Sequence, residues 1–141
     1  MQIPVVTLLG FAAWTLLTLF GSVGVYRWSR ILAGRASISE WQADIPQGDD
    51  WYRRAMRAHM NCVENLPLFT ALVVAQLATG VRSPVIDVLC IFVLACRIGQ
   101  TVIHIALRPS NWAASLRFGL FAAQAFSMIA IGVVIASQMR F

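Results

Sequence analysis

Two long stretches of this sequence contain no charged side chain, and they constrain the fold more than any other feature. Residues 2–26 and 118–139 lack Asp, Glu, Lys and Arg. A helix needs about 20 residues to cross a hydrocarbon core about 30 Å thick, so either stretch is long enough. Charged residues make up 12% of the chain, against roughly 25% in ordinary soluble domains. The sequence therefore predicts an integral membrane protein.

Four spanning helices fit the chain as a single domain. We expect them over about residues 3–27, 51–79, 84–107 and 111–138, with residues 28–50 as a long loop. The turn between the second and third helices is short, so these two helices should lie antiparallel and side by side. Pro109 stops the third helix, and the residues after it cap the fourth. The predicted fold class is all-α, an integral membrane four-helix bundle.

The basic residues indicate an orientation in the membrane. All of them are arginine, and the net charge is +5. They gather at helix ends instead of forming the continuous basic stripe that nucleic-acid binding needs, so we expect no nucleic-acid partner. Six of them flank the long loop: Arg27, Arg30, Arg35, Arg53, Arg54 and Arg57. By the positive-inside rule this loop should be cytoplasmic and both termini should lie on the other side.

The cysteines do not indicate a metal centre. Cys62, Cys90 and Cys96 all fall inside predicted spans, and their spacing matches neither a metal-ligand set nor a redox pair. We expect them to behave as small buried hydrophobes.

Polar side chains recur at helical spacing inside three of the predicted spans. They form these groups: Arg57, Asn61 and Glu64; Arg97, Gln100, Thr101 and His104; Arg117 and Gln124. At a rise of about 1.5 Å per residue, Glu64 and Arg97 both lie about 16 Å from the cytoplasmic side. A lone charge at that depth costs at least about 2.5 kcal/mol. The sequence therefore predicts a Glu64–Arg97 ion pair with a structural role.

The polar groups above this pair should form a cationic funnel that opens to the cytoplasm. Its expected members are Arg57, Asn61, Gln100, His104, Arg117 and either Arg27 or Arg30. Such a site suits an anion with several carboxylates, while the membrane supplies an apolar second substrate. The alternative interpretation is that arginines at the interface extend toward water, and it accounts for Arg27, Arg30, Arg53 and Arg108. It does not account for Arg57 and Arg117, which lie deeper and share their helix faces with other polar groups.

One stretch of the second predicted helix resembles a known family. Residues 54–69 read RAMRAHMNCVENLPLF, which is similar to the second-helix signature of the MAPEG family of eicosanoid and glutathione metabolism. The third predicted helix (RIGQTVIH, residues 97–104) and Arg117 agree with it. The resemblance covers the whole chain and is closest to bacterial, microsomal glutathione transferase-like members. It implies a homotrimer in the bacterial inner membrane, with glutathione bound between subunits near the cytoplasmic side.

The resemblance also implies roles for individual residues. Arg117 would be the catalytic arginine that stabilises the glutathione thiolate, and Arg97 would be the internal partner of Glu64. The remaining implied glutathione-binding positions are Arg57, Asn61, Glu64, Gln100, His104, and Arg27 or Arg30. Three positions depart from the better-known members: Met60 stands in place of an arginine, and His104 and Phe121 in place of tyrosines. Each departure removes a contact that glutathione could make.

The expected activity is that of a glutathione transferase, with or without peroxidase activity. A thiol has a pKa of about 8.5, and a nearby cation lowers this value. A shift of about two units corresponds to about 2.7 kcal/mol. The thiolate would attack a lipophilic electrophile from the bilayer, and no metal is required. The alternative is a non-catalytic protein that binds lipid or a partner helix on the same scaffold. A transporter is disfavoured because a pathway needs polar groups across the full depth of the membrane.

Overall fold

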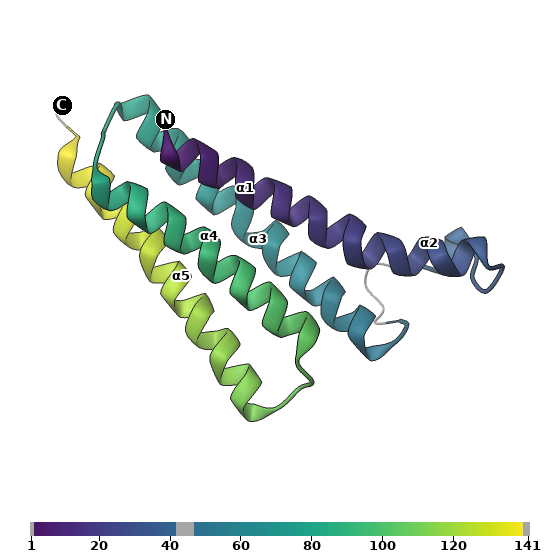
Figure 1. The fold of residues 1–141 in the computed structure, drawn as a ribbon. Helices are drawn as coiled ribbons and strands as arrows, with labels where there is room; N and C mark the ends of the chain where they lie inside the picture. Colours follow the sequence, from purple (N-terminus) through teal and green to yellow (C-terminus); the bar gives the residue numbers. More distant parts are fainter. Residues whose placement is uncertain (1, 42–46, 140–141) are drawn as a thin grey trace.

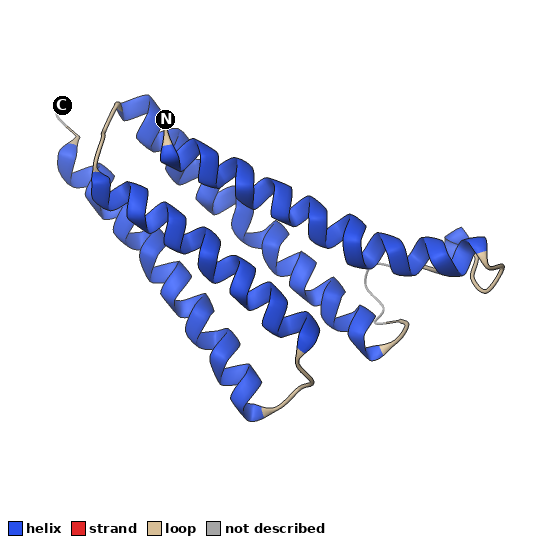
Figure 2. Ribbon diagram, in the orientation of Figure 1, coloured by secondary structure: helices blue, strands red, loops and turns tan. Residues whose placement is uncertain are grey.

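The computed structural model describes residues 2–41 and 47–139, and within these ranges the chain is helical with no strand (Figure 2). Four helices are long and apolar enough to cross a membrane: Ile3–Leu32, Asp50–Thr79, Pro84–Ala106 and Asn111–Gln138. The predicted fold class, an all-α membrane bundle with four spans, is confirmed.

The first span is longer than predicted and is built from three consecutive helical segments. These are α1 (Ile3–Thr18), the π-helical segment η1 (Leu19–Gly24) and α2 (Val25–Leu32). Within η1 the Ser22 hydroxyl donates to the Thr18 carbonyl, and side-chain bonds of this kind to the helix backbone often bend helices. The helix passes the predicted end at residue 27 because arginine is a good helix former, so an arginine near the membrane surface does not stop a helix.

The other spans begin and end where the sequence carries turn and cap residues. They are α3 (Asp50–Thr79), α4 (Pro84–Ala106) and α5 (Asn111–Gln138). Gly80 adopts φ +68° directly after α3, a left-handed conformation that glycine takes without a steric cost. The Ser110 hydroxyl accepts a hydrogen bond from a backbone N–H in the first turn of α5, 3.2 Å away. A short 3-10 turn, η2 (Ile38–Glu40), follows the first span.

Helix α4 lies at the centre of the bundle, in contact with α1, α3 and α5 (Figure 1). Phe11 of α1 and Phe69 of α3 are fully buried, with ring centroids 5.8 Å apart. Val93 of α4 and Ile131 of α5 complete this core. The three cysteines are also buried in the bundle, as expected. In a bilayer this core is stabilised mainly by close packing, because the lipid outside is as apolar as the interior.

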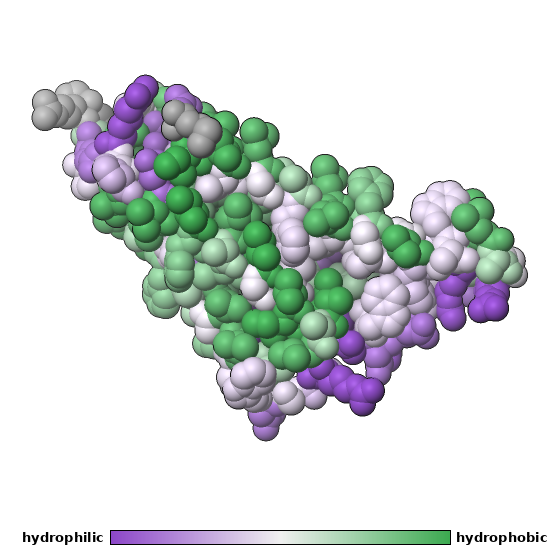
Figure 3. All heavy atoms as spheres, viewed as in Figure 1, coloured by the Kyte–Doolittle hydropathy of each residue, from purple (hydrophilic) through white to green (hydrophobic). Residues whose placement is uncertain are grey.

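The bundle has two polar ends separated by an apolar band. The two termini and the turn at residues 80–83 lie at one end, which we call the terminal end (Figure 1). The segments at residues 33–41, 47–49 and 107–110 lie at the other, which we call the loop end. Figure 3 shows hydrophilic residues gathered at both ends and hydrophobic residues over the helices between them. This distribution is that of a protein embedded across a bilayer.

Stacked aromatic rings fasten the loop end. Tyr26 and Tyr52 stack with centroids 4.2 Å apart, and Trp41 and Trp51 contact Tyr26 edge-on. We call these four residues the aromatic cluster. The backbone N–H of Asp49 donates to the Tyr26 hydroxyl over 3.0 Å. The cluster therefore holds the start of α3 against the end of the first span.

Candidate functional site

A cavity of about 290 Å³ opens at the loop end. It lies between the start of α3, the last turn of α4 and the start of α5, and it is lined by Asp50, Arg53, Arg54, Arg57, His104, Pro109 and Arg117. Asp50 forms an ion pair with Arg53. Among the residues that the structure describes, the three other arginines of this lining have no carboxylate paired with them, so the described lining carries an excess of positive charge that favours anions.

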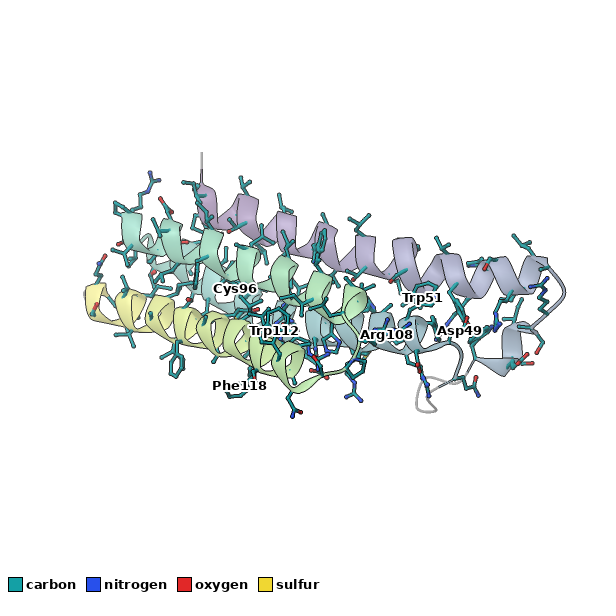
Figure 4. The ribbon with its side chains drawn as sticks, turned by 60° about the horizontal axis from the view of Figure 1, so that its bottom comes forward. Asp49, Trp51, Cys96, Arg108, Trp112 and Phe118 are labelled. Atoms are coloured by element: carbon teal, nitrogen blue, oxygen red, sulfur yellow. The ribbon has the colours of Figure 1, made fainter. Side chains whose placement is uncertain are left out.

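Three residues that the sequence analysis proposed for one site meet in this cavity. Arg57 lies on the second turn of α3, His104 on the last turn of α4, and Arg117 on the second turn of α5. The antiparallel order of the helices brings the end of α4 and the starts of α3 and α5 to the same level. Figure 4 shows this end of the molecule, with Arg108 just beyond α4 and Cys96 midway along that helix.

Arg117 is held by α4 at both its side chain and its backbone. Its Nη1 lies 3.4 Å from Nδ1 of His104, and its carbonyl oxygen accepts a bond from Nε2 of Gln100 over 3.3 Å. Gln100 in turn accepts a bond of 2.6 Å from Nη1 of Arg97. A continuous line of hydrogen bonds therefore runs from the centre of the bundle to the cavity.

Arg54 lines the cavity, although its position in the sequence predicted only that it flanks the loop. Its Nε and Nη2 both donate to the carbonyl oxygen of Ile105, 3.3 Å away. This carbonyl lies in the last turn of α4, where helix carbonyls lack a partner within the helix. The available signal was its spacing, three residues before Arg57, which places both side chains on the same side of α3.

A comparison with protein families identifies this architecture. The model of the MAPEG family matches residues 5–137, which is nearly the whole chain. The chain belongs to the MAPEG family. This family includes glutathione transferases and other activities, and its members generally use glutathione. No curated protein and no solved structure gives a significant match to the chain.

The predicted Glu64–Arg97 ion pair does not form within this MAPEG protomer. In the described ranges the only ion pair is the one between Arg53 and Asp50. Arg97 is completely buried and donates to Gln100, whereas Glu64 is exposed on the outer side of α3. The orientation of Cys62 explains why, since its sulfur faces Thr101 of α4. Glu64 follows Cys62 by two residues, which is about 200° around the helix, so Glu64 points away from α4. Glu64 and Arg97 therefore lie at a similar depth, but their side chains point in different directions.

Asn61 lies one turn deeper than Arg57 and does not line the cavity. Its backbone carbonyl accepts a bond of 2.8 Å from Asn65, whose side-chain oxygen lies 3.4 Å from Nε2 of Gln124 in α5. Gln124 is almost fully buried. This amide pair links α3 and α5 near mid-membrane in this MAPEG chain. Asn65 was not among the predicted site residues because it lies at the edge of the face of α3 that carries Arg57, Asn61 and Glu64.

Arg27 and Arg30 both contact the aromatic cluster and do not line the cavity of their own protomer. The Nε of Arg27 donates to the Tyr52 hydroxyl over 2.6 Å, and its guanidinium lies 5.5 Å from the Trp41 ring centroid. Nη1 of Arg30 donates to the Tyr26 hydroxyl over 2.9 Å. These contacts give both arginines a structural role at the loop end, supported by cation–π attraction.

Proposed function

We propose that this MAPEG protein is a membrane-bound glutathione-dependent transferase. The observation that carries the proposal is the placement of the Arg117 guanidinium in a cationic cavity beside His104, Arg54 and Arg57. The proposal also uses family membership, since MAPEG members generally use glutathione.

The residues of the cavity suit glutathione. This tripeptide carries two carboxylates and a thiol, and guanidinium groups bind carboxylates through paired, charge-assisted hydrogen bonds. The cavity of about 290 Å³ lies at the lower limit of small-molecule sites, which span about 300–1,000 Å³. One protomer therefore offers part of a site, and we infer that a neighbouring subunit completes it.

The proposed chemistry needs only the side chains of the chain and the two substrates. Arg117 donates to the sulfur and stabilises its anionic form, and the thiol proton leaves to water through the open side of the cavity. The thiolate then attacks the electrophilic carbon of a lipophilic substrate. With an aryl halide, the sulfur–carbon bond forms and the halide departs as an anion. A stabilisation by about two pKa units corresponds to about 2.7 kcal/mol.

The experiment that tests this function is an assay of the purified protein with glutathione and an aryl halide, together with a measurement of glutathione binding. We expect glutathione to bind and the conjugate to form in proportion to protein concentration. Binding without turnover across several electrophiles would support the non-catalytic alternative. A protein that binds no glutathione would contradict the proposal.

A prediction for binding concerns Arg57. Its replacement by alanine removes one cation from the cavity, and a hydrogen bond to a charged group contributes about 1.5–3 kcal/mol. We therefore expect KM for glutathione to rise about 10- to 100-fold with a much smaller change in kcat. Steady-state kinetics would measure both constants. Arg35→Ala is the matched control, because Arg35 is exposed at the loop end outside the cavity; an equal rise in KM for this control would contradict a specific role for Arg57.

We infer that the protein is a homotrimer in which a second copy covers the outer face of α3. This face carries Arg57, Glu64, Ala71, Ala75 and Ala78, all exposed in the protomer. Glu64 lies near the middle of a helix of 30 residues. A carboxylate facing lipid at that depth is expensive, and small residues allow helices to approach closely.

The assembly can be tested with bulky substitutions on this face. Ala75→Trp places a large ring where we expect close packing of helices, and an overpacking substitution typically costs about 1–3 kcal/mol. We expect the complex to dissociate to protomers in mild detergent, as measured by light scattering or native mass spectrometry. Leu77→Trp is the control, because Leu77 is exposed on another side of α3. A trimer that keeps its mass in the Ala75 variant would contradict this interface.

We further infer that the loop end faces the cytoplasm of a bacterial inner membrane, with both termini on the opposite side. The arginines at the loop end are Arg27, Arg30, Arg35, Arg53, Arg54, Arg57, Arg108 and Arg117. At the terminal end, the described residues contain Arg82 alone. This asymmetry is the one that retains a loop on the cytoplasmic side.

A further inference from the structure

We propose that Arg97 and Gln100 are positioning residues that set the place of the Arg117 guanidinium. This inference rests on the proposed transferase function and goes beyond it. Arg97 was expected to form a structural ion pair; here it instead contributes to the reaction indirectly, through Arg117.

Arg97 is buried, and one side-chain hydrogen bond determines the orientation of its guanidinium. Arg97 is 0% exposed, and its guanidinium lies 5.7 Å from the centroid of the Phe11 ring. Within the described part of the chain, its Nε and Nη2 have no hydrogen-bond partner. The bond of 2.6 Å from Nη1 to Oε1 of Gln100 is therefore the contact that fixes where this buried cation points.

The charge of Arg97 also determines which way the Gln100 amide faces. A guanidinium can only donate hydrogen bonds, so the oxygen of the amide must face Arg97 and its NH₂ group must face away. The NH₂ group then donates to the carbonyl oxygen of Arg117, 3.3 Å away. A reversed amide would place two oxygens against each other and leave Arg97 without an acceptor.

Gln100 and His104 together hold Arg117 from one face of α4. They are four residues apart and thus neighbours on the same side of the helix. Gln100 binds the backbone of Arg117, and Nδ1 of His104 contacts its guanidinium at 3.4 Å. Arg117 itself is only half-buried, so its long side chain would otherwise sample several rotamers. A displacement of about 1 Å at a reacting group can reduce a rate about 100-fold.

The test is the variant Gln100→Glu. A glutamate keeps an acceptor for Arg97 but cannot donate to the Arg117 carbonyl when it is ionised. We expect kcat to fall about tenfold with KM for glutathione almost unchanged, as for a small displacement of the reacting group. The pH at which the rate is half-maximal should rise, because the thiolate is stabilised less. The ultraviolet absorbance of the bound thiolate, titrated with pH, should show the same rise without any turnover.

The matched control is Gln76→Glu at the terminal end. Gln76 is 8% exposed, and its Nε2 donates to the carbonyl oxygen of Val81 over 3.1 Å. Both variants therefore replace a buried glutamine whose amide donates to a backbone carbonyl. We expect this variant to lower thermal stability and to leave both pH profiles where they are.

A double-mutant cycle separates positioning from a direct effect of the new charge. In an Arg117→Ala background, Gln100→Glu should change the rate by less than about twofold, since the residue it positions is gone. An equal loss in both backgrounds, or a Gln100→Glu enzyme with wild-type kcat and pH profile, would overturn the positioning role while the transferase function stands. A wild-type protein without glutathione binding would overturn the transferase function itself, and this inference with it.

Discussion

Replacing Arg117 by alanine is expected to lower the rate of glutathione conjugation at neutral pH about 100-fold. The guanidinium is the group proposed to hold the sulfur as a thiolate, and a shift of about two pKa units changes the thiolate fraction by about this factor. The loss should shrink as the pH rises toward about 8.5, where the free thiol ionises without help. A pH–rate profile of the variant beside the wild type would measure both effects.

Two further variants make this result specific to the guanidinium. Arg117→Lys keeps the charge but loses the planar, multiple donors, so we expect activity between those of the wild type and the alanine variant. Arg108→Ala removes an exposed arginine of the loop end that does not line the cavity, and we expect no change beyond about twofold. An Arg117→Ala enzyme with a wild-type rate and profile would show that another group activates the thiol.

Replacing Gly48 by alanine should produce the largest loss of stability among simple loop substitutions, about 2–5 kcal/mol. Gly48 has φ +86°, and a left-handed backbone costs other residues about 1–2 kcal/mol. A Cβ there would lie 2.7 Å from Cδ1 of Tyr52 and 3.0 Å from the Tyr26 ring, so the stacked rings would have to shift. Overpacking of this kind adds about 1–3 kcal/mol. Thermal unfolding in detergent at a fixed scan rate would measure the loss.

Gly34 provides the control for this substitution. It has φ +67°, but no atom lies within 4 Å of a Cβ built there. Gly34→Ala should therefore show the backbone contribution alone, about 1–2 kcal/mol. Equal losses at the two positions would mean that contact with the aromatic cluster contributes nothing to the stability of the loop end.

Several features of the site could be predicted from spacing because helix geometry is regular. Arg57 near the start of one helix, His104 near the end of the next and Arg117 near the start of the last must reach the same end of an up-and-down bundle. Their common level follows from the length of each helix at about 1.5 Å per residue. The structure places all three around one cavity.

The partners of these residues could not be predicted from spacing. Depth along a helix is set by residue number, but direction around it depends on which neighbour the helix packs against. Glu64 and Arg97 share a depth and point apart, so Arg97 bonds to Gln100 on its own helix. The same limitation concealed the contact between Asn65 and Gln124, which depends on how α5 rests against α3 and α4.

What the sequence determined by itself is the membrane environment, because its two long uncharged stretches are stable only across a bilayer, and the number of spans, because turn and cap residues divide the rest of the chain into helices of spanning length. It also carried the family signature that the comparison confirms. Only the tertiary structure decided which side chains meet. Arg27 and Arg30 bond to the aromatic cluster, and Arg54 bonds to the end of α4. A line of hydrogen bonds runs from Arg97 through Gln100 to Arg117. These contacts depend on the rotation of each helix about its own axis, which is settled when all four helices pack together.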